Sequence, residues 1–207
     1  MDVKYTFRDL VVYLLTGVFC SFMITLVHPD ILKNFLKLDY LQGKEVTMLI
    51  IAIPILYIFG HIIQMIDLLF SFYIVNILKS YKKGNWIKRT ISKLFYKIFA
   101  STTAEYHREK LGLTEDDHIL QKFYIVVVYD KNNDAGYYYL MKELFSGIKS
   151  FLIIYLFYLL CINNWKILPY ATILLGLVWL KAYNSSNNYV WSLTNTYRAL
   201  KQKENKL

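Results

Sequence analysis

The dominant pattern along this chain is a pair of long, uninterrupted hydrophobic runs. Residues 46–78 form a run of 33 positions in which Asp67 is the single formally charged side chain, and residues 10–27 carry none. An α-helix rises about 1.5 Å per residue, so about 20 apolar residues cross the roughly 30 Å hydrocarbon core of a bilayer. The pattern predicts membrane-spanning helices over 10–27 and 46–66, with the second helix continuing beyond the bilayer.

Two weaker hydrophobic runs follow, over residues 145–163 and 167–183. Lys149 and Lys181 interrupt them, so both spans require these lysine side chains to extend along the helix to the lipid headgroups. A re-entrant or interfacial helical hairpin is the competing interpretation. The pattern as a whole predicts an all-α integral membrane helical bundle of about four transmembrane helices with a helical insert in the cytoplasm.

The basic residues predict an orientation. If the N-terminus, residues 79–149 and the C-terminal part from Lys181 onward share one side of the membrane, that side holds 20 of the 24 lysines and arginines. Because Lys and Arg accumulate on the cytoplasmic side, both termini are expected there. The expected division is an N-terminal membrane part (1–78), a basic cytoplasmic helical region (79–145), a membrane hairpin (146–183) and a basic cytoplasmic tail (184–207). In the tail, a polar break at 184–188 precedes a short basic helix.

Composition agrees with a membrane protein. The hydrophobic fraction of 56% exceeds the roughly 45–50% of soluble domains, and the aromatic content of 17% excludes an intrinsically disordered chain. The net charge of +9 follows largely from the topology. Direct nucleic-acid binding is therefore not expected.

Polar side chains in the second span recur at helical spacing. The set is Tyr57, His61, Gln64, Asp67 and Ser71, hereafter the polar seam. Spacings of three and four residues place these side chains on one helix face. Polar groups at membrane depth normally face protein or water, which leaves two interpretations. The seam lines a pore or an oligomer axis, with His61 as a pH-sensitive element, or it hydrogen-bonds a neighbouring helix while Asp67 lies at the cytoplasmic interface.

Two further patterns concern helix packing and surface contacts. Small residues at four-residue spacing, which allow helices to approach closely, are Gly17, Ser21 and Thr25 in the first span and Thr172 and Gly176 in the fourth. A basic face interleaved with aromatic residues comprises Lys82, Lys83, Lys88, Arg89, Lys93 and Lys97. This face suits anionic membrane lipids, and the alternatives are a protein partner or nucleic acid.

Candidate chemistry is sparse. A cluster of potential ligands comprises Glu105, His107, Glu109, Asp116, Asp117 and His118, but its spacing matches no zinc-site template, and a solvated polar face is the simpler interpretation. The sequence contains no phosphate-binding glycine loop, no GxSxG and no CxxC. No catalytic residue, metal site or cofactor is predicted, and enzymatic function has no support in the sequence.

The layout of the chain resembles a known class of proteins. The segments FRDLVVYLLTG and YIFGHIIQ, a helical cytoplasmic insert and a closing hydrophobic hairpin resemble small bacterial membrane proteins of phage-defence loci. Among these, the membrane accessory proteins of type VI-B CRISPR systems are similar in length and number of spans. The resemblance implies an inner-membrane location and a role in antiviral defence. An Arg–His ribonuclease pair, found in some such proteins, is absent here, so no catalytic residue is implied.

These observations favour one function and leave two alternatives. The favoured function is a homo-oligomeric membrane effector, pore-forming or depolarising, that is controlled through its cytoplasmic region. The first alternative is a non-conducting membrane anchor or regulator that binds a cytosolic defence protein or a CRISPR ribonucleoprotein. The second is an interfacial lipid-modifying enzyme that uses His107 and His118.

Overall fold

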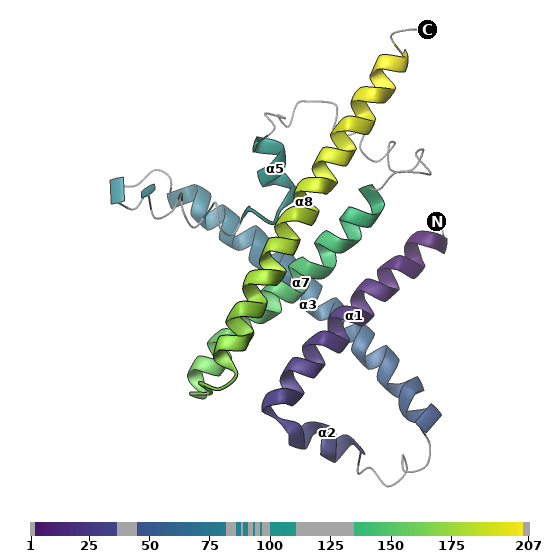
Figure 1. Ribbon diagram of the computed structural model, residues 1–207, viewed down its shortest axis with the longest axis vertical. Helices are drawn as coiled ribbons and strands as arrows, with labels where there is room; N and C mark the ends of the chain where they lie inside the picture. Colours follow the sequence, from purple (N-terminus) through teal and green to yellow (C-terminus); the bar gives the residue numbers. More distant parts are fainter. Residues whose placement is uncertain are drawn as a thin grey trace. The chain divides into compact units, whose positions relative to one another are not determined.

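The described part of the protein consists of helices and short turns. A computed structural model describes residues 3–36, 45–81, 86, 87, 89, 90, 93, 96, 100–110 and 135–204, and no strand occurs among them. The helices are α1 (Val3–Val27), α2 (Pro29–Leu36), α3 (Glu45–Tyr81), α5 (Ala104–Lys110), α7 (Ala135–Cys161) and α8 (Leu168–Glu204), as labelled in Figure 1. The all-helical prediction is confirmed for this part of the chain.

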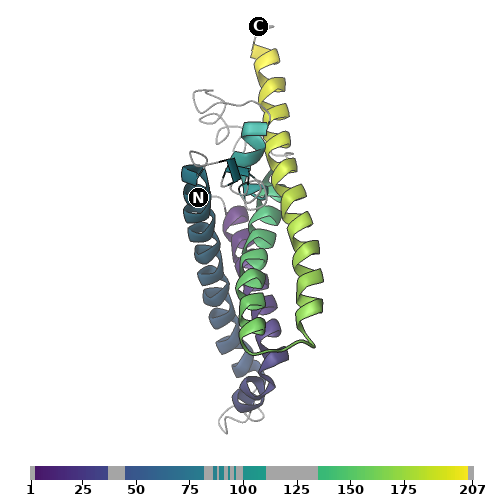
Figure 2. The same ribbon diagram turned by 90° about the vertical axis from the view of Figure 1, so that its left-hand side faces the viewer.

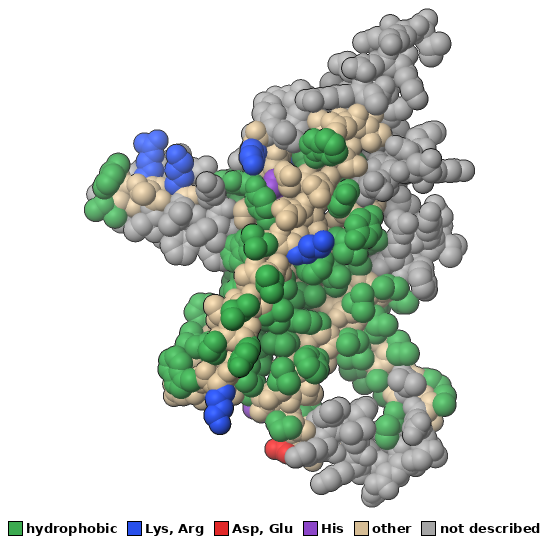
Figure 3. Space-filling model, viewed as in Figure 1, with side chains coloured by type: hydrophobic (Ala, Val, Ile, Leu, Met, Phe, Trp, Pro, Cys, Tyr) green, Lys and Arg blue, Asp and Glu red, His purple; other side chains and the backbone are tan. Residues whose placement is uncertain are grey.

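Within the described residues, three helices carry segments long and apolar enough to cross a membrane. These segments are Leu10–Val27 in α1, Val46–Tyr73 in α3 and Gly136–Cys161 in α7. Their outward surfaces are rich in large hydrophobic side chains such as Phe22, Ile58 and Phe157. The face drawn in Figure 3 is accordingly dominated by hydrophobic side chains, with few charged groups. Three of the four expected spans thus correspond to helices of suitable length and composition.

Helix α8 differs from two expectations. The expected fourth span at 167–183 lies in α8, which is not among the helices that qualify, because Lys181 and the polar residues from Asn184 shorten its apolar part. The expected break at 184–188 does not occur, because α8 runs unbroken from Leu168 to Glu204. Ser185, Val190 and Leu193 are buried, so an inward helix face continues through the polar stretch, and packing overrides its weak helix propensity.

The chain forms two compact units. Unit 1 is formed by Met1–Leu68 and Ser146–Leu175, and unit 2 by Leu69–Phe145 and Gly176–Leu207. The long helices α3, α7 and α8 each contribute to both units. In unit 1, α7 and α8 are joined by the short connection 162–167, which is seen in Figure 2.

The core of unit 1 contains a very close approach of α1 and α3. A Cβ atom on Gly17 would overlap the backbone carbonyl of Leu56, and one on Gly60 would overlap that of Tyr13. Only glycine leaves room for this contact between two backbones. Helix α7 is also attached to α1, because the Tyr155 hydroxyl donates a hydrogen bond of 2.7 Å to the Met23 carbonyl.

Unit 2 combines α5 with the adjoining parts of α7 and α8. The Trp179 indole N–H donates to the Ser101 hydroxyl at 3.1 Å, which attaches α8 to the turn before α5. The Lys142 ammonium lies 5.1 Å from the ring centroid of Tyr139 and 5.8 Å from that of Tyr189. Both distances suit cation–π attraction, so Lys142 links α7 to α8.

The close approach of α1 and α3 predicts that unit 1 does not accept a methyl group at position 60. Gly60→Ala should lower the free energy of unfolding by about 1–3 kcal/mol, because overpacking displaces two backbones. The measurement is thermal unfolding in detergent micelles, followed by circular dichroism. Gly176→Ala is the matched control, because a Cβ there meets no atom within 4 Å. Equal unfolding temperatures for the two variants would contradict the contact.

Candidate functional site

The candidate site is a buried ion pair between two apolar helices in unit 1. Asp67 on α3 and Lys149 on α7 are 8% and 4% exposed, and the Lys149 Nζ lies 3.7 Å from the Asp67 Oδ1. Lys149 stands near the middle of the apolar segment Gly136–Cys161, and Asp67 lies within Val46–Tyr73. Ionisable residues in such segments are rare and mark a functional hypothesis by default.

Two serine hydroxyls complete the surroundings of the Asp67 carboxylate. Ser146 donates to Oδ2 at 2.7 Å and Ser150 donates to Oδ1 at 2.5 Å. The Lys149 ammonium in turn donates to the Ser146 hydroxyl at 3.4 Å. Positions 146, 149 and 150 share one helix face because they are separated by three or four residues. One face of α7 therefore supplies a cation and two hydroxyl donors to a single carboxylate.

A glycine on α7 makes room for the next polar residue of α3. Gln64 is buried, and a Cβ atom on Gly147 would overlap its amide group. Gln64 therefore lies directly on the backbone of α7, one turn from Asp67. A polar stretch of α3 is thus covered by the Ser-Gly-x-Lys-Ser segment of α7, residues 146–150.

The electrostatics of this site favour a structural role. A carboxylate and an ammonium side by side carry no net charge, and hydrogen bonds to a carboxylate offset much of its desolvation. A group of three or more His, Cys, Asp or Glu side chains suitable for a metal ion does not occur among the described residues. The arrangement can join two helices and hold a charge pair out of water.

The polar seam divides between two neighbouring helices. Gln64 and Asp67 face α7, whereas Tyr57 and His61 lie beside Tyr13 of α1. The His61 ring stacks on the Tyr13 ring with centroids 3.9 Å apart, and the Tyr57 ring meets the Tyr13 ring edge-on at 5.8 Å. His61 is nevertheless exposed, and Ser71, which belongs to unit 2, is half-buried.

The expected orientation of Lys149 is wrong. The sequence predicts that it extends to the headgroups, but it is buried and faces Asp67. An ion pair with a buried carboxylate compensates the lysine charge without contact with water. Ser146, Gly147 and Ser150 were not among the predicted site residues. The signal that would have found them is the three- and four-residue spacing of Ser146, Lys149 and Ser150 in an apolar run.

The predicted small-residue positions occupy different environments. Gly17 lies at the α1–α3 contact, and Ser21 and Thr25 are half-buried on the same helix. Thr172 and Gly176 of α8 are exposed. The hydroxyls of Thr25 and Thr172 donate to carbonyl groups of their own helices, those of Phe22 and Leu168.

The basic face is described only in part. Arg89 and Lys93 are exposed. Lys82, Lys83, Lys88 and Lys97 lie outside the described residues, as do Asp116, Asp117 and His118 and the side chains of Glu105 and Glu109.

His107, the described histidine of the candidate ligand cluster, is buried in unit 2. It is 1% exposed, and its Nε2 lies 2.8 Å from the Ser101 carbonyl oxygen. Its ring meets the Tyr183 ring of α8 with centroids 4.9 Å apart. Burial lowers the pKa of His107 below its ordinary value, against the opposing effect of the Ser101 carbonyl, and the nearby Lys110 charge lowers it further. The neutral imidazole is therefore the form that this packing favours.

Comparison with known protein families, with curated protein sequences and with solved structures finds no match to this chain.

The ion pair predicts strong energetic coupling between positions 67 and 149. Asp67→Asn should lower the free energy of unfolding by about 3–5 kcal/mol, because the Lys149 ammonium stays buried without its counter-charge. The double variant D67N/K149M should recover much of this loss. Urea unfolding in micelles measures the coupling as a double-mutant cycle.

Lys181→Met is the control for that cycle. Lys181 is exposed on α8, so its replacement should change stability by no more than about 0.5 kcal/mol. Additive effects of D67N and K149M would contradict the pairing.

Burial of His107 predicts that acid destabilises unit 2. The unfolded chain takes up a proton near pH 6.5, whereas the folded state, with its lowered pKa, does not. Stability should therefore fall as pH decreases below about 6.5, until the folded pKa is passed. Unfolding followed at a series of pH values should show this slope in the wild type and a smaller one in His107→Gln. A slope of equal size in His107→Gln would contradict this assignment.

Proposed function

We propose that this chain is a multi-pass protein of the bacterial inner membrane with both termini in the cytoplasm. The three apolar segments support membrane insertion, and the distribution of Lys and Arg supports the orientation. Helix α8 turns back after residues 162–167, and its Tyr189 contacts Tyr139 of α7 with ring centroids 5.5 Å apart. A helix that returns beside a membrane-spanning α7 has to cross as well, which supports a fourth span and a cytoplasmic C-terminus.

The function supported best is that of a non-conducting membrane anchor or regulator. The Asp67–Lys149 site carries this proposal. Asp67 and Gln64 are the seam residues best suited to line a water-filled conduit, and both are buried against α7. The carboxylate accepts two hydroxyl hydrogen bonds and faces an ammonium, so protein takes the place that water would hold in a pore.

The resemblance to membrane proteins of phage-defence loci supports antiviral defence as the setting. Under this proposal the membrane helices hold the cytoplasmic region against the bilayer, where it acts on a cytosolic defence protein or a CRISPR ribonucleoprotein. Exposed Arg89 and Lys93 suit an anionic surface, and anionic lipid is abundant on the cytoplasmic leaflet.

A pore-forming oligomer is the second candidate, and His61 favours it. This side chain is exposed near the middle of the apolar segment Val46–Tyr73. A polar ring facing hydrocarbon is unfavourable, so His61 favours contact with a second copy of the chain or with water. Such an oligomer would place Tyr57 and His61, rather than Asp67, toward its axis.

Ion flux separates the two candidates. Proteoliposomes that contain the wild-type protein should show no greater potassium flux, reported by an entrapped potassium-sensitive dye, than protein-free vesicles. The reason is that Gln64 and Asp67, the two seam residues best suited to line a conduit, are covered by α7. His61→Ala combined with Gln64→Ala should leave this basal flux unchanged.

Two outcomes would reject the anchor and support the pore. One is potassium flux through wild-type vesicles that the paired variant abolishes. The other is depolarisation of cells that express the wild-type protein, with none in cells that express the paired variant at equal membrane levels. Recovery of the protein without detergent, dissolved and monodisperse, would reject membrane insertion itself.

A further inference from the structure

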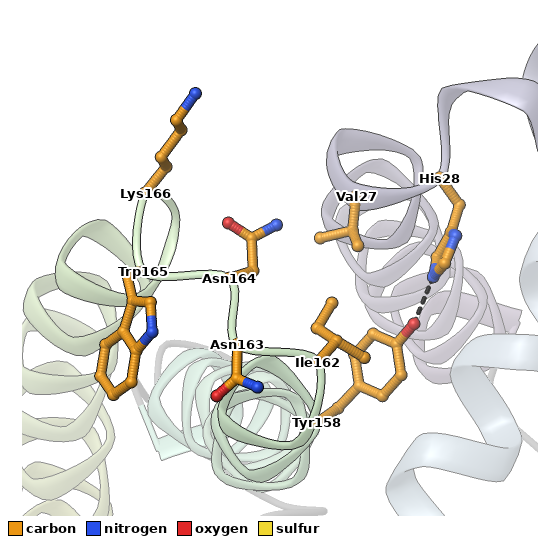
Figure 4. A pocket seen from close by; sticks show the side chains of 8 residues that line it. All are labelled: Val27, His28, Tyr158, Ile162, Asn163, Asn164, Trp165 and Lys166. Atoms are coloured by element: carbon orange, nitrogen blue, oxygen red, sulfur yellow. Dashed lines mark hydrogen bonds between the residues drawn. The ribbon is translucent and has the colours of Figure 1, made fainter.

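A pocket of about 550 Å³ lies in unit 1 at the end of α1 and α7. One wall is formed by Val27 and His28, the floor by Tyr158 and Ile162 of α7 and its extension, and the other wall by the connection 163–166. Figure 4 shows the two walls facing each other across the opening. The volume falls within the range of about 300–1,000 Å³ that is usual for small-molecule sites.

The pocket stands at the limit of two apolar segments. Leu10–Val27 ends at its first wall, and Gly136–Cys161 ends next to Ile162. If these segments cross a bilayer, the pocket lies at the level of the headgroups. Its Trp165 and Tyr158 are the aromatic residues that favour this interface.

The lining is divided between apolar and polar groups. Val27 and Ile162 supply hydrocarbon surface, and Asn163 and Asn164 supply amide groups. Lys166 adds an ammonium at the rim, with its side chain extending away from the floor in Figure 4. None of the lining residues is acidic. The Asn164 Oδ1 accepts a hydrogen bond of 3.3 Å from the Ile167 N–H. This hydrogen bond engages the oxygen of the Asn164 side chain and leaves its Nδ2 group to donate to a ligand. A hydrogen bond between His28 and the Tyr158 hydroxyl joins the first wall to the floor.

We propose that this pocket binds the phosphate-bearing headgroup of a membrane phospholipid. The Lys166 ammonium attracts the phosphate, and the Asn164 side-chain amide donates hydrogen bonds to the phosphate oxygens. The acyl chains of the lipid pack against Val27 and Ile162. A cation beside amide donors suits a phosphate, and the apolar surface suits the chains of a lipid rather than a free anion. This inference rests on the proposed membrane placement.

The test measures lipid retention by the purified full-length protein in detergent, using native mass spectrometry. Three probes separate the parts of the ligand: dioleoyl phosphatidylglycerol, dioleoylglycerol with the same chains and no phosphate, and glycerol 3-phosphate with no chains. The wild type should retain phosphatidylglycerol, should not retain dioleoylglycerol, and should not exchange bound lipid for glycerol 3-phosphate.

Two variants test the residues. Lys166→Gln should weaken retention of phosphatidylglycerol about tenfold, the effect of losing one hydrogen bond to a charged group. Asn164→Asp keeps an acceptor for the Ile167 N–H and adds a negative charge, so it should weaken retention at least as much. Lys181→Gln removes an exposed lysine that is not among the lining residues and should retain lipid as the wild type does.

Several results would overturn the proposal. Unchanged retention in both pocket variants, with wild-type unfolding temperatures, would exclude Lys166 and Asn164 as ligands. If dioleoylglycerol is retained as well as phosphatidylglycerol, the phosphate is not recognised. If glycerol 3-phosphate displaces bound phosphatidylglycerol, the pocket is a site for a free anion. The experiment is made in detergent, so these failures differ from failure of membrane placement, which detergent-free solubility reports.

Discussion

The constraint on which unit 1 depends is that an ionised carboxylate in an apolar helix needs compensation. Asp67 occupies a segment that is otherwise almost free of charge. Its carboxylate interacts with three side chains of α7, those of Ser146, Lys149 and Ser150. The Lys149 ammonium neutralises the charge of the carboxylate, and the two serine hydroxyls donate hydrogen bonds to its oxygens. A different rotation of α7 about its axis would separate the Lys149 ammonium and both serine hydroxyls from the Asp67 carboxylate, so this one contact defines which face of α7 meets α3.

Close backbone packing supplies the second constraint. Gly17 and Gly60 bring α1 against α3, and Gly147 brings α7 against Gln64. Under the proposed membrane placement, hydrophobic burial does not drive the helices together, so their association depends on such packing and on polar contacts. Polar contacts and glycine contacts therefore act together here, because the close approach at Gly147 places Gln64 beside the Ser-Lys-Ser face. Both kinds of contact support the proposed non-conducting anchor over an open conduit.

Unit 2 uses different interactions. Neutral His107, the Trp179–Ser101 hydrogen bond and the Lys142 contacts with Tyr139 and Tyr189 join α5, α7 and α8 through polar and aromatic groups. Groups of this kind suit a region in contact with water and leave its stability responsive to pH. Under the proposed function, these contacts stabilise the cytoplasmic region that the membrane helices anchor.

The pattern of apolar residues was sufficient for the helical class and for three segments of membrane-spanning length, because both depend on local composition. It also placed Gln64 and Asp67 on one face of α3, since helical spacing is a local property. It misjudged Lys149 and the continuity of α8, and it did not find Ser146, Gly147 or Ser150. Which face of one helix meets which face of another is decided by contacts between residues about 80 positions apart, and no local pattern contains that information. The sequence placed Lys149 among the lipid headgroups, and only the tertiary structure shows that this lysine pairs with the buried Asp67.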